Sequence, residues 1–145
     1  MVKLRIKKLN EKAVIPTYGT EYSAGADLYA VGEKYEIEPH KTVLVKTGIS
    51  MEIPEGYAGL IFARSGMASK RGLAPANKVG VIDADYRGEI MVALHNHSDV
   101  KQIVEEGERV AQISIVPFLK VEFEECEELS ETVRGAGGFG STGTK

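Results

Sequence analysis

The chain has 145 residues, a formal net charge of −3 and one cysteine. This length predicts a single domain with a core large enough to be stable without cross-links, and one cysteine excludes an internal disulfide framework and a cysteine-rich zinc site. A mildly acidic chain is not expected to bind nucleic acid through a basic groove, although a few arginines in one pocket can still bind a triphosphate.

The N-terminal segment alternates apolar and charged residues, which is typical of a strand and not of a secretion signal. No apolar run approaches the roughly 18 residues that a membrane helix needs. We therefore expect no membrane partner and a reducing, cytoplasmic location.

Several short segments with period-two alternation follow one another in the first half of the chain and predict strands. They lie around Leu4 and Ile6, then at residues 35–37, 43–45 and 49–53. Residues 13–21 contain Pro16 and Gly19 and are expected to form a connecting loop. Residues 23–26, which precede Asp27 and Leu28, are all small. Small side chains let the backbone approach another group closely.

The apolar segment 57–62 predicts a buried strand, and the mixed segment 64–72, which ends in glycine, predicts one short helix. Ser65 is the expected N-cap of this helix. Free N–H groups at a helix start attract phosphate, but a capping role without any ligand is the alternative interpretation.

The central segment 80–89 reads Gly-Val-Ile-Asp-Ala-Asp-Tyr-Arg-Gly-Glu. A short apolar strand that ends in acids and a glycine turn can hold a carboxylate against a water molecule as a general base, with the Tyr86 ring as a flat face beside it. Taken alone, the same pattern also fits a surface hairpin with two solvated acids.

Further strands are predicted at Ile90–Leu94 and around Ala111–Ile115, where Gln112 falls on the face opposite the apolar residues. Residues 95–98 are expected to form a turn. Its two histidines share a face, but without a third ligand nearby they do not predict a metal site.

The C-terminal region begins with the alternating segment 119–123, which predicts a last strand, and continues with an acidic run through Glu131, which predicts a solvated linker. Five glycines occur within residues 134–143, so this end is expected to be a mobile arm. Many short strands, one helix and frequent turns predict an all-β sandwich or jelly roll over residues 1–130, with residues 131–145 as a flexible arm.

Five blocks of the sequence, in this order, resemble the five motifs of the trimeric dUTPase family. They are residues 23–30, 64–68, 80–89, 107–112 and 134–143. Together they extend over nearly the whole chain, which makes the match specific.

The resemblance implies a jelly-roll homotrimer that hydrolyses dUTP to dUMP and pyrophosphate by attack of water on the α-phosphorus. This activity supplies dUMP for thymidylate synthesis and keeps uracil out of DNA. Asp83 would activate the water, with Ser65 and Gln112 as further catalytic residues, and Tyr86 would stack under the deoxyribose. The hairpin would read uracil through Asn77, Val81, Ile82 and Met91.

The resemblance also implies a phosphate site and a closing arm, shared between three subunits. Arg64, Ser65, Gly66 and Gln112 would hold the phosphates, and Asp27 would meet Mg²⁺ through its water shell. The arm would contribute a positive charge, a stacking ring, backbone groups and hydroxyls from Arg134, Phe139, Gly140, Ser141 and Thr142.

Two other functions stay open at this point. A dCTP deaminase, or a bifunctional enzyme, shares the fold but needs a catalytic glutamate, and Glu89 is the nearest acid beyond the hairpin. A nucleotide-binding regulatory trimer without activity would lack Asp83 or the arm, and both are present. Ala63 and the Ala-Pro-Ala segment before Asn77 depart from the family pattern and could alter how the hairpin packs.

Overall fold

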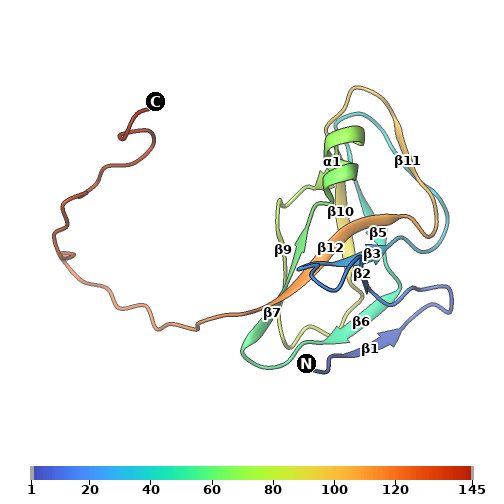
Figure 1. The fold of residues 1–145 in the computed structure, drawn as a ribbon, viewed down its shortest axis with the longest axis horizontal. Coiled ribbons are helices and arrows are strands. Elements are labelled where there is room, and N and C mark those ends of the chain that lie inside the picture. Colours follow the sequence, from blue (N-terminus) through green and yellow to red (C-terminus); the bar gives the residue numbers. More distant parts are fainter. Residues whose placement is uncertain (1, 145) are drawn as a thin grey trace.

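The computed structural model describes residues 2–144. Within them the chain forms twelve strands and one helix, and the part after Pro117 leaves the body of the molecule as a long extension (Figure 1). The helix has seven residues, and no helix in the described part of the chain is long and apolar enough to cross a membrane. The prediction of an all-β fold with one short helix is therefore confirmed.

The elements are short and follow one another closely. In chain order they are β1 (Arg5–Lys8), β2 (Thr17–Tyr18), β3 (Ala26–Tyr29), β4 (Tyr35–Ile37), β5 (Thr42–Lys46), β6 (Ile49–Glu52), β7 (Tyr57–Phe62), α1 (Ser65–Arg71), β8 (Leu73–Pro75), β9 (Gly80–Ile82), β10 (Met91–Asn96), β11 (Gln102–Val104) and β12 (Arg109–Pro117).

All strand pairings are antiparallel among the described residues. The largest sheet has the order β2-β3-β12-β7-β9, and a second sheet has the order β5-β10-β8. Two further two-stranded sheets are formed by β1 with β6 and by β4 with β11. Neighbours such as β3 and β12 are distant in sequence, which is typical of jelly-roll connections.

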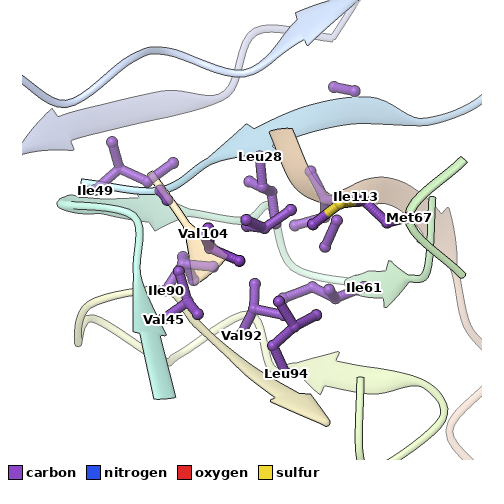
Figure 2. Packing of buried hydrophobic residues seen from close by; sticks show 14 of the residues in the cluster. Leu28, Val45, Ile49, Ile61, Met67, Ile90, Val92, Leu94, Val104 and Ile113 are labelled. Atoms are coloured by element: carbon purple, nitrogen blue, oxygen red, sulfur yellow. The ribbon is translucent and has the colours of Figure 1, made fainter. Parts of the chain in front are cut away.

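The core lies between the two larger sheets (Figure 2). Leu28, Ile61 and Ile113 from the five-stranded sheet belong to the same buried cluster as Val92 and Leu94 of β10. Alternate residues of each strand point inward, as the period-two pattern predicts. Met67 is the buried residue of α1, and it joins this helix to the same core.

Gly48 occupies a position at which a side chain would not fit. Its φ is +68°, and an added Cβ would lie 2.8 Å from Val31 Cγ1 and 3.0 Å from Ala13 Cβ. Both the backbone conformation and the close packing therefore require glycine here.

Four local predictions differ from the structure, three of them in the positions of strands and loops. The expected loop 13–21 contains the short strand β2, and His95 and Asn96 belong to β10 and not to the turn that follows it. Residues 119–123 form no strand, and Leu119 and Phe123 are 85% and 93% exposed. The apolar alternation of this segment is real, but a strand also needs a pairing partner, and among residues 2–144 no segment pairs with it.

Ser65 is not the N-cap of α1. The cap is Arg64, which keeps an extended conformation (φ −88°, ψ 135°) and makes no side-chain capping hydrogen bond. Because the backbone of Arg64 is still extended, Ser65 is the first helical residue instead. The helix ends at Gly72, whose left-handed conformation (φ 65°) closes it, as its terminal glycine predicted.

Candidate functional site

A pocket of about 310 Å³ opens between β9, the turn that follows it and β10. Six of the predicted nucleoside-binding residues line it together: Asn77, Val81, Ile82, Asp83, Tyr86 and Met91. The sequence predicts that one hairpin holds these residues, and in the structure their side chains line one pocket.

The turn after β9 fixes the positions of Asp83 and Tyr86. The backbone N–H of Tyr86 donates to Asp83 O at 3.1 Å, and the Tyr86 hydroxyl donates to Glu89 O at 2.9 Å. A side chain at Gly88 would overlap the Tyr86 ring, so only glycine lets the ring lie against the turn. Asp83 itself is exposed at the pocket, where its carboxylate can reach a water molecule.

The remaining wall of the pocket comes from the sheet β5-β10-β8. Met91 and Ala93 point to the same side of β10, and Ala93 pairs with Leu44 of β5. Pro75, on the other side of β10, pairs with Leu94 and also lines the pocket. Sequence reasoning missed Leu44, Pro75 and Ala93, because only the strand register brings β5 and β8 beside β10.

Glu89 is a further lining residue of this pocket. Its Oε2 is buried and has no hydrogen-bond partner among residues 2–144. Sequence reasoning placed this acid just beyond the hairpin, whereas the structure places it in the pocket wall.

A second group of polar side chains lies on the five-stranded sheet. Gln112 of β12 pairs with Asp27 of β3 on one side and with Phe62 of β7 on the other. Arg64 Nε donates to Asp27 Oδ1 at 2.7 Å, and Arg109 Nη1 donates to Asp27 Oδ2 at 3.3 Å. Two guanidinium groups on one carboxylate leave a net positive charge at this place.

Gln112 is held firmly in this group. Its Nε2 donates to Ala63 O at 2.9 Å, and a side chain at Gly25 would overlap its amide. The small residues before Asp27 thus permit a close approach, as predicted, and within the chain the approaching group is Gln112. Ser65 and Gly66 follow Arg64 and are exposed at the start of α1. Arg109 was not among the predicted site residues, although it lies in the fourth motif block.

The two groups are separate within one chain. Ile82 pairs with Gly59 of β7, while Gln112 pairs with Phe62, three residues farther along the same strand. This offset corresponds to about 10 Å along the sheet. Neither Arg64 nor Gln112 lines the nucleoside pocket.

The C-terminal arm lies away from both groups (Figure 1). Arg134 Nε donates to Gly137 O at 2.7 Å, within the arm itself, and Ser141 N donates to Gly138 O at 3.1 Å. The Phe139 ring is fully exposed, and Gly140 and Thr142 are exposed as well. In this conformation the arm does not cover the pocket of its own chain.

The sequence and the fold were compared with those of known proteins. The sequence model of the dUTPase family matches residues 11–143. A deoxyuridine 5'-triphosphate nucleotidohydrolase from Hydrogenobaculum sp. (strain Y04AAS1) is 54% identical over 144 residues, which are 99% of this chain and 100% of the relative.

Solved structures give the same result. A mutant dUTPase of Staphylococcus bacteriophage 80alpha with dUpNHpp has a TM-score of 0.91 and 31% identity, over 99% of this chain and 100% of that chain. A mutant dUTPase from phage phi11 of S. aureus, described as revealing the coordination of a structural Mg(II) ion, has a TM-score of 0.79 and 29% identity, over 88% and 98% of the two chains. The chain belongs to the dUTPase family and hydrolyses dUTP to dUMP.

Proposed function

We propose that this hydrolysis proceeds by attack of a water molecule on the α-phosphorus, with pyrophosphate as the leaving group and Asp83 as the general base. One observation carries the proposal: Asp83 lies exposed at the edge of the same pocket that gathers the predicted nucleoside-binding residues. A carboxylate at this place can accept the proton of a water held between it and the α-phosphate.

The pocket itself would select deoxyuridine. The Asn77 amide offers a donor and an acceptor to the edge of the uracil ring, and the backbone of β9 offers more. Tyr86 is fixed by its bond to Glu89 O and by Gly88, so its ring would occupy the space that a 2′-hydroxyl needs. A site built to hydrogen-bond one edge rejects another base by a factor of about 10⁴ to 10⁵.

Arg64, Ser65, Gly66 and Gln112 would hold the phosphates, with Ser65 and Gln112 beside the reacting group. Since none of these residues lines the pocket of its own chain, and Gln112 and Ile82 are offset by about 10 Å along β7, we propose that they act on a nucleotide bound in the pocket of a second copy. The arm, with Arg134, Phe139, Gly140, Ser141 and Thr142, would come from a third copy and close the site. The assembly is thus a homotrimer with shared sites.

Two apolar surfaces of the single chain support this assembly. A groove of about 410 Å³ is lined mainly by apolar residues of β1, β12 and their neighbours, among them Leu4, Ile6, Tyr57, Ile113 and Ile115. The alternating segment 119–123 is exposed and unpaired in the described structure. Exposed apolar surface of this kind is usual where copies of a chain meet.

Magnesium fits the second group of polar residues as an ion carried by the triphosphate. Among residues 2–144 no three histidine, cysteine or acidic side chains converge on one point, so the protein offers no closed metal cage. Asp27 accepts one bond on each oxygen, and a carboxylate has further lone pairs that can accept from the water shell of the ion. The ion would supply charge neutralisation at the phosphates, and Asp27 would help to hold it.

Mixing of two impaired variants tests the shared site. Asp83→Asn chains with an intact arm are unfolded and refolded together with chains that end before Arg134 and keep Asp83. In a cyclic trimer every mixed assembly has one position where an intact Asp83 meets an intact arm. With random equal mixing, roughly a quarter of the sites should recover activity.

Each variant refolded alone serves as the control and should keep at most about a tenth of the parent rate, clearly below the quarter expected for the mixture. If Asp83 and the arm of one site came from the same chain, the mixture would be no more active than the two variants alone. Product analysis with dUTP, dCTP and dTTP in the recovered mixture checks the base preference at the same time.

A further inference from the structure

All three histidines of the chain lie at one end of the sheet β5-β10-β8. His95 belongs to β10 and His97 follows its last residue, and the centroids of their two rings are 4.5 Å apart with an angle of 80° between the ring planes. His40 precedes β5, and its backbone N–H donates to Asn96 O at 2.8 Å. None of these histidines lines the nucleoside pocket or belongs to the group formed by Asp27, Arg64, Arg109 and Gln112.

The hydrogen bonds leave one nitrogen of each paired ring free. His97 Nδ1 lies 3.2 Å from Gly72 O, and because a carbonyl oxygen only accepts, Nδ1 carries the proton and Nε2 has a bare lone pair. His95 Nδ1 contacts Thr42 Oγ1 at 2.9 Å. Neither Nε2 has a hydrogen-bond partner among residues 2–144, whereas His40 Nε2 is bound to Asp99 Oδ1 at 2.8 Å.

A neutral imidazole with a free lone pair is the form that binds a metal ion.

We propose that Nε2 of His95 and Nε2 of His97 together bind one divalent transition-metal ion, such as Zn²⁺, Ni²⁺ or Cu²⁺. Imidazole suits these ions, and metal-binding histidines usually donate their other N–H to a backbone carbonyl or a polar side chain, as His97 does to Gly72. Since no three ligating groups converge among the described residues, water fills the other positions of the ion. The sequence pattern alone did not predict this site; the paired rings and their free nitrogens do.

Such a site differs chemically from the magnesium of the substrate. Mg²⁺ prefers oxygen ligands and keeps its water shell, so it competes poorly for two imidazoles. The two ions are therefore expected to bind independently.

Calorimetric titration of Zn²⁺ into the untagged full-length chain tests the proposal. The parent protein carries Cys126→Ser, because Cys126 is an exposed free thiol and a thiolate can bind zinc. We expect one ion per chain. His95→Asn and His97→Asn should each weaken binding at least about tenfold, and Thr42→Val, which removes the hydroxyl at His95 Nδ1, should weaken it by about tenfold or more.

His40→Asn is the matched control, since it removes the third histidine of the same cluster and should leave the affinity unchanged. Retained dUTP hydrolysis in Mg²⁺ shows that each variant folds. As a second measurement, substoichiometric Ni²⁺ should broaden the NMR signals of His95 and His97 before those of His40. The absence of zinc binding by the parent, equal weakening by His40→Asn, or displacement of zinc by millimolar Mg²⁺ would each overturn the proposal.

Discussion

Arg64 Nε donates a 2.7 Å hydrogen bond to Asp27 Oδ1 across the strand that lies between their two elements. The intervening strand is β12, and its Gln112 is paired with Asp27 itself. The other oxygen of Asp27 accepts from Arg109. One carboxylate thus holds two guanidinium groups side by side, with the Gln112 amide next to them.

Asp27→Asn should therefore lower kcat/KM for dUTP. Removal of a charge-assisted contact of this kind costs about 1.5–3 kcal/mol, which corresponds to roughly a ten- to hundredfold loss. If Asp27 also contacts the water shell of Mg²⁺, the Mg²⁺ concentration for half-maximal activity should rise in this variant. Arg109→Gln is the control: it should lower kcat/KM without changing the Mg²⁺ requirement. An unchanged requirement in both variants would restrict Asp27 to positioning the arginines.

Asp83→Asn should reduce kcat by about 10² to 10⁴, because an amide keeps the shape of the side chain but cannot accept a proton. Binding of a non-hydrolysable dUTP analogue should stay nearly as tight, since Asp83 lies at the edge of the pocket. Steady-state kinetics and calorimetry measure the two quantities separately. A variant that kept most of its kcat would show that another group is the base.

Tyr86→Ala should reduce the preference for dUTP over UTP, expressed as the ratio of their kcat/KM values, by about tenfold or more. Tyr86→Phe is the matched control, because it keeps the ring and loses only the hydroxyl that donates to Glu89 O. The phenylalanine variant should keep most of the discrimination. Equal ratios in the parent and the alanine variant would remove the ring from the sugar site.

Removal of residues 134–145 should slow turnover by about ten- to hundredfold while the protein stays folded and still binds uracil nucleotide. Residues 134–144 place no side chain in the core, so loss of the arm should leave the buried cluster intact. The loss of rate is expected because the contacts that we propose between Arg134 and the phosphates would be missing. Full activity in the truncated protein would show that the arm is only a linker.

Gly48→Ala should destabilise the protein more than Gly56→Ala does. Both glycines have positive φ, +68° and +81°, so both substitutions carry a backbone cost of about 1–2 kcal/mol. Only at Gly48 does the new methyl group also meet packed side chains, which adds about 1–3 kcal/mol. Urea unfolding at one protein concentration measures the difference. Equal free energies of unfolding would show that the surroundings of Gly48 relax without cost.

Apolar alternation and short apolar runs were sufficient to predict eight of the twelve strands, and the mixed polarity and terminal glycine of residues 64–72 predicted the helix. The strands β2, β3, β8 and β11 were not predicted. Ala111, Ile113 and Gln112 fell on the expected faces because β12 has buried neighbours on both sides. The same pattern was wrong for residues 119–123, since alternation shows which residues a strand could bury and not whether a pairing strand is present. The position of the helix cap depended on the backbone of β7 and could not be predicted from the hydroxyl of Ser65.

The candidate site was predictable where its residues are adjacent in sequence, as on the hairpin that holds Asp83 and Tyr86. Leu44 and Arg109 were missed for a different reason. Leu44 reaches the pocket through the register of β5 with β10, and Arg109 reaches Asp27 through the pairing of β12 with β3. Such long-range pairings leave no local signal in the sequence.

The nucleoside pocket and the group of Asp27, Arg64 and Gln112 lie on different elements of the chain, which has a consequence for how this enzyme can evolve. In the proposed trimer the two meet on one nucleotide but at its opposite ends, and they share no lining residue within a chain, so substitutions in one should be nearly additive with substitutions in the other. Natural selection can therefore change the base preference through the hairpin around Asn77 and Met91 while the residues proposed to bind the triphosphate stay the same. Descendants with new base specificity would be expected to keep Asp27, Arg64 and Gln112 while their hairpins diverge.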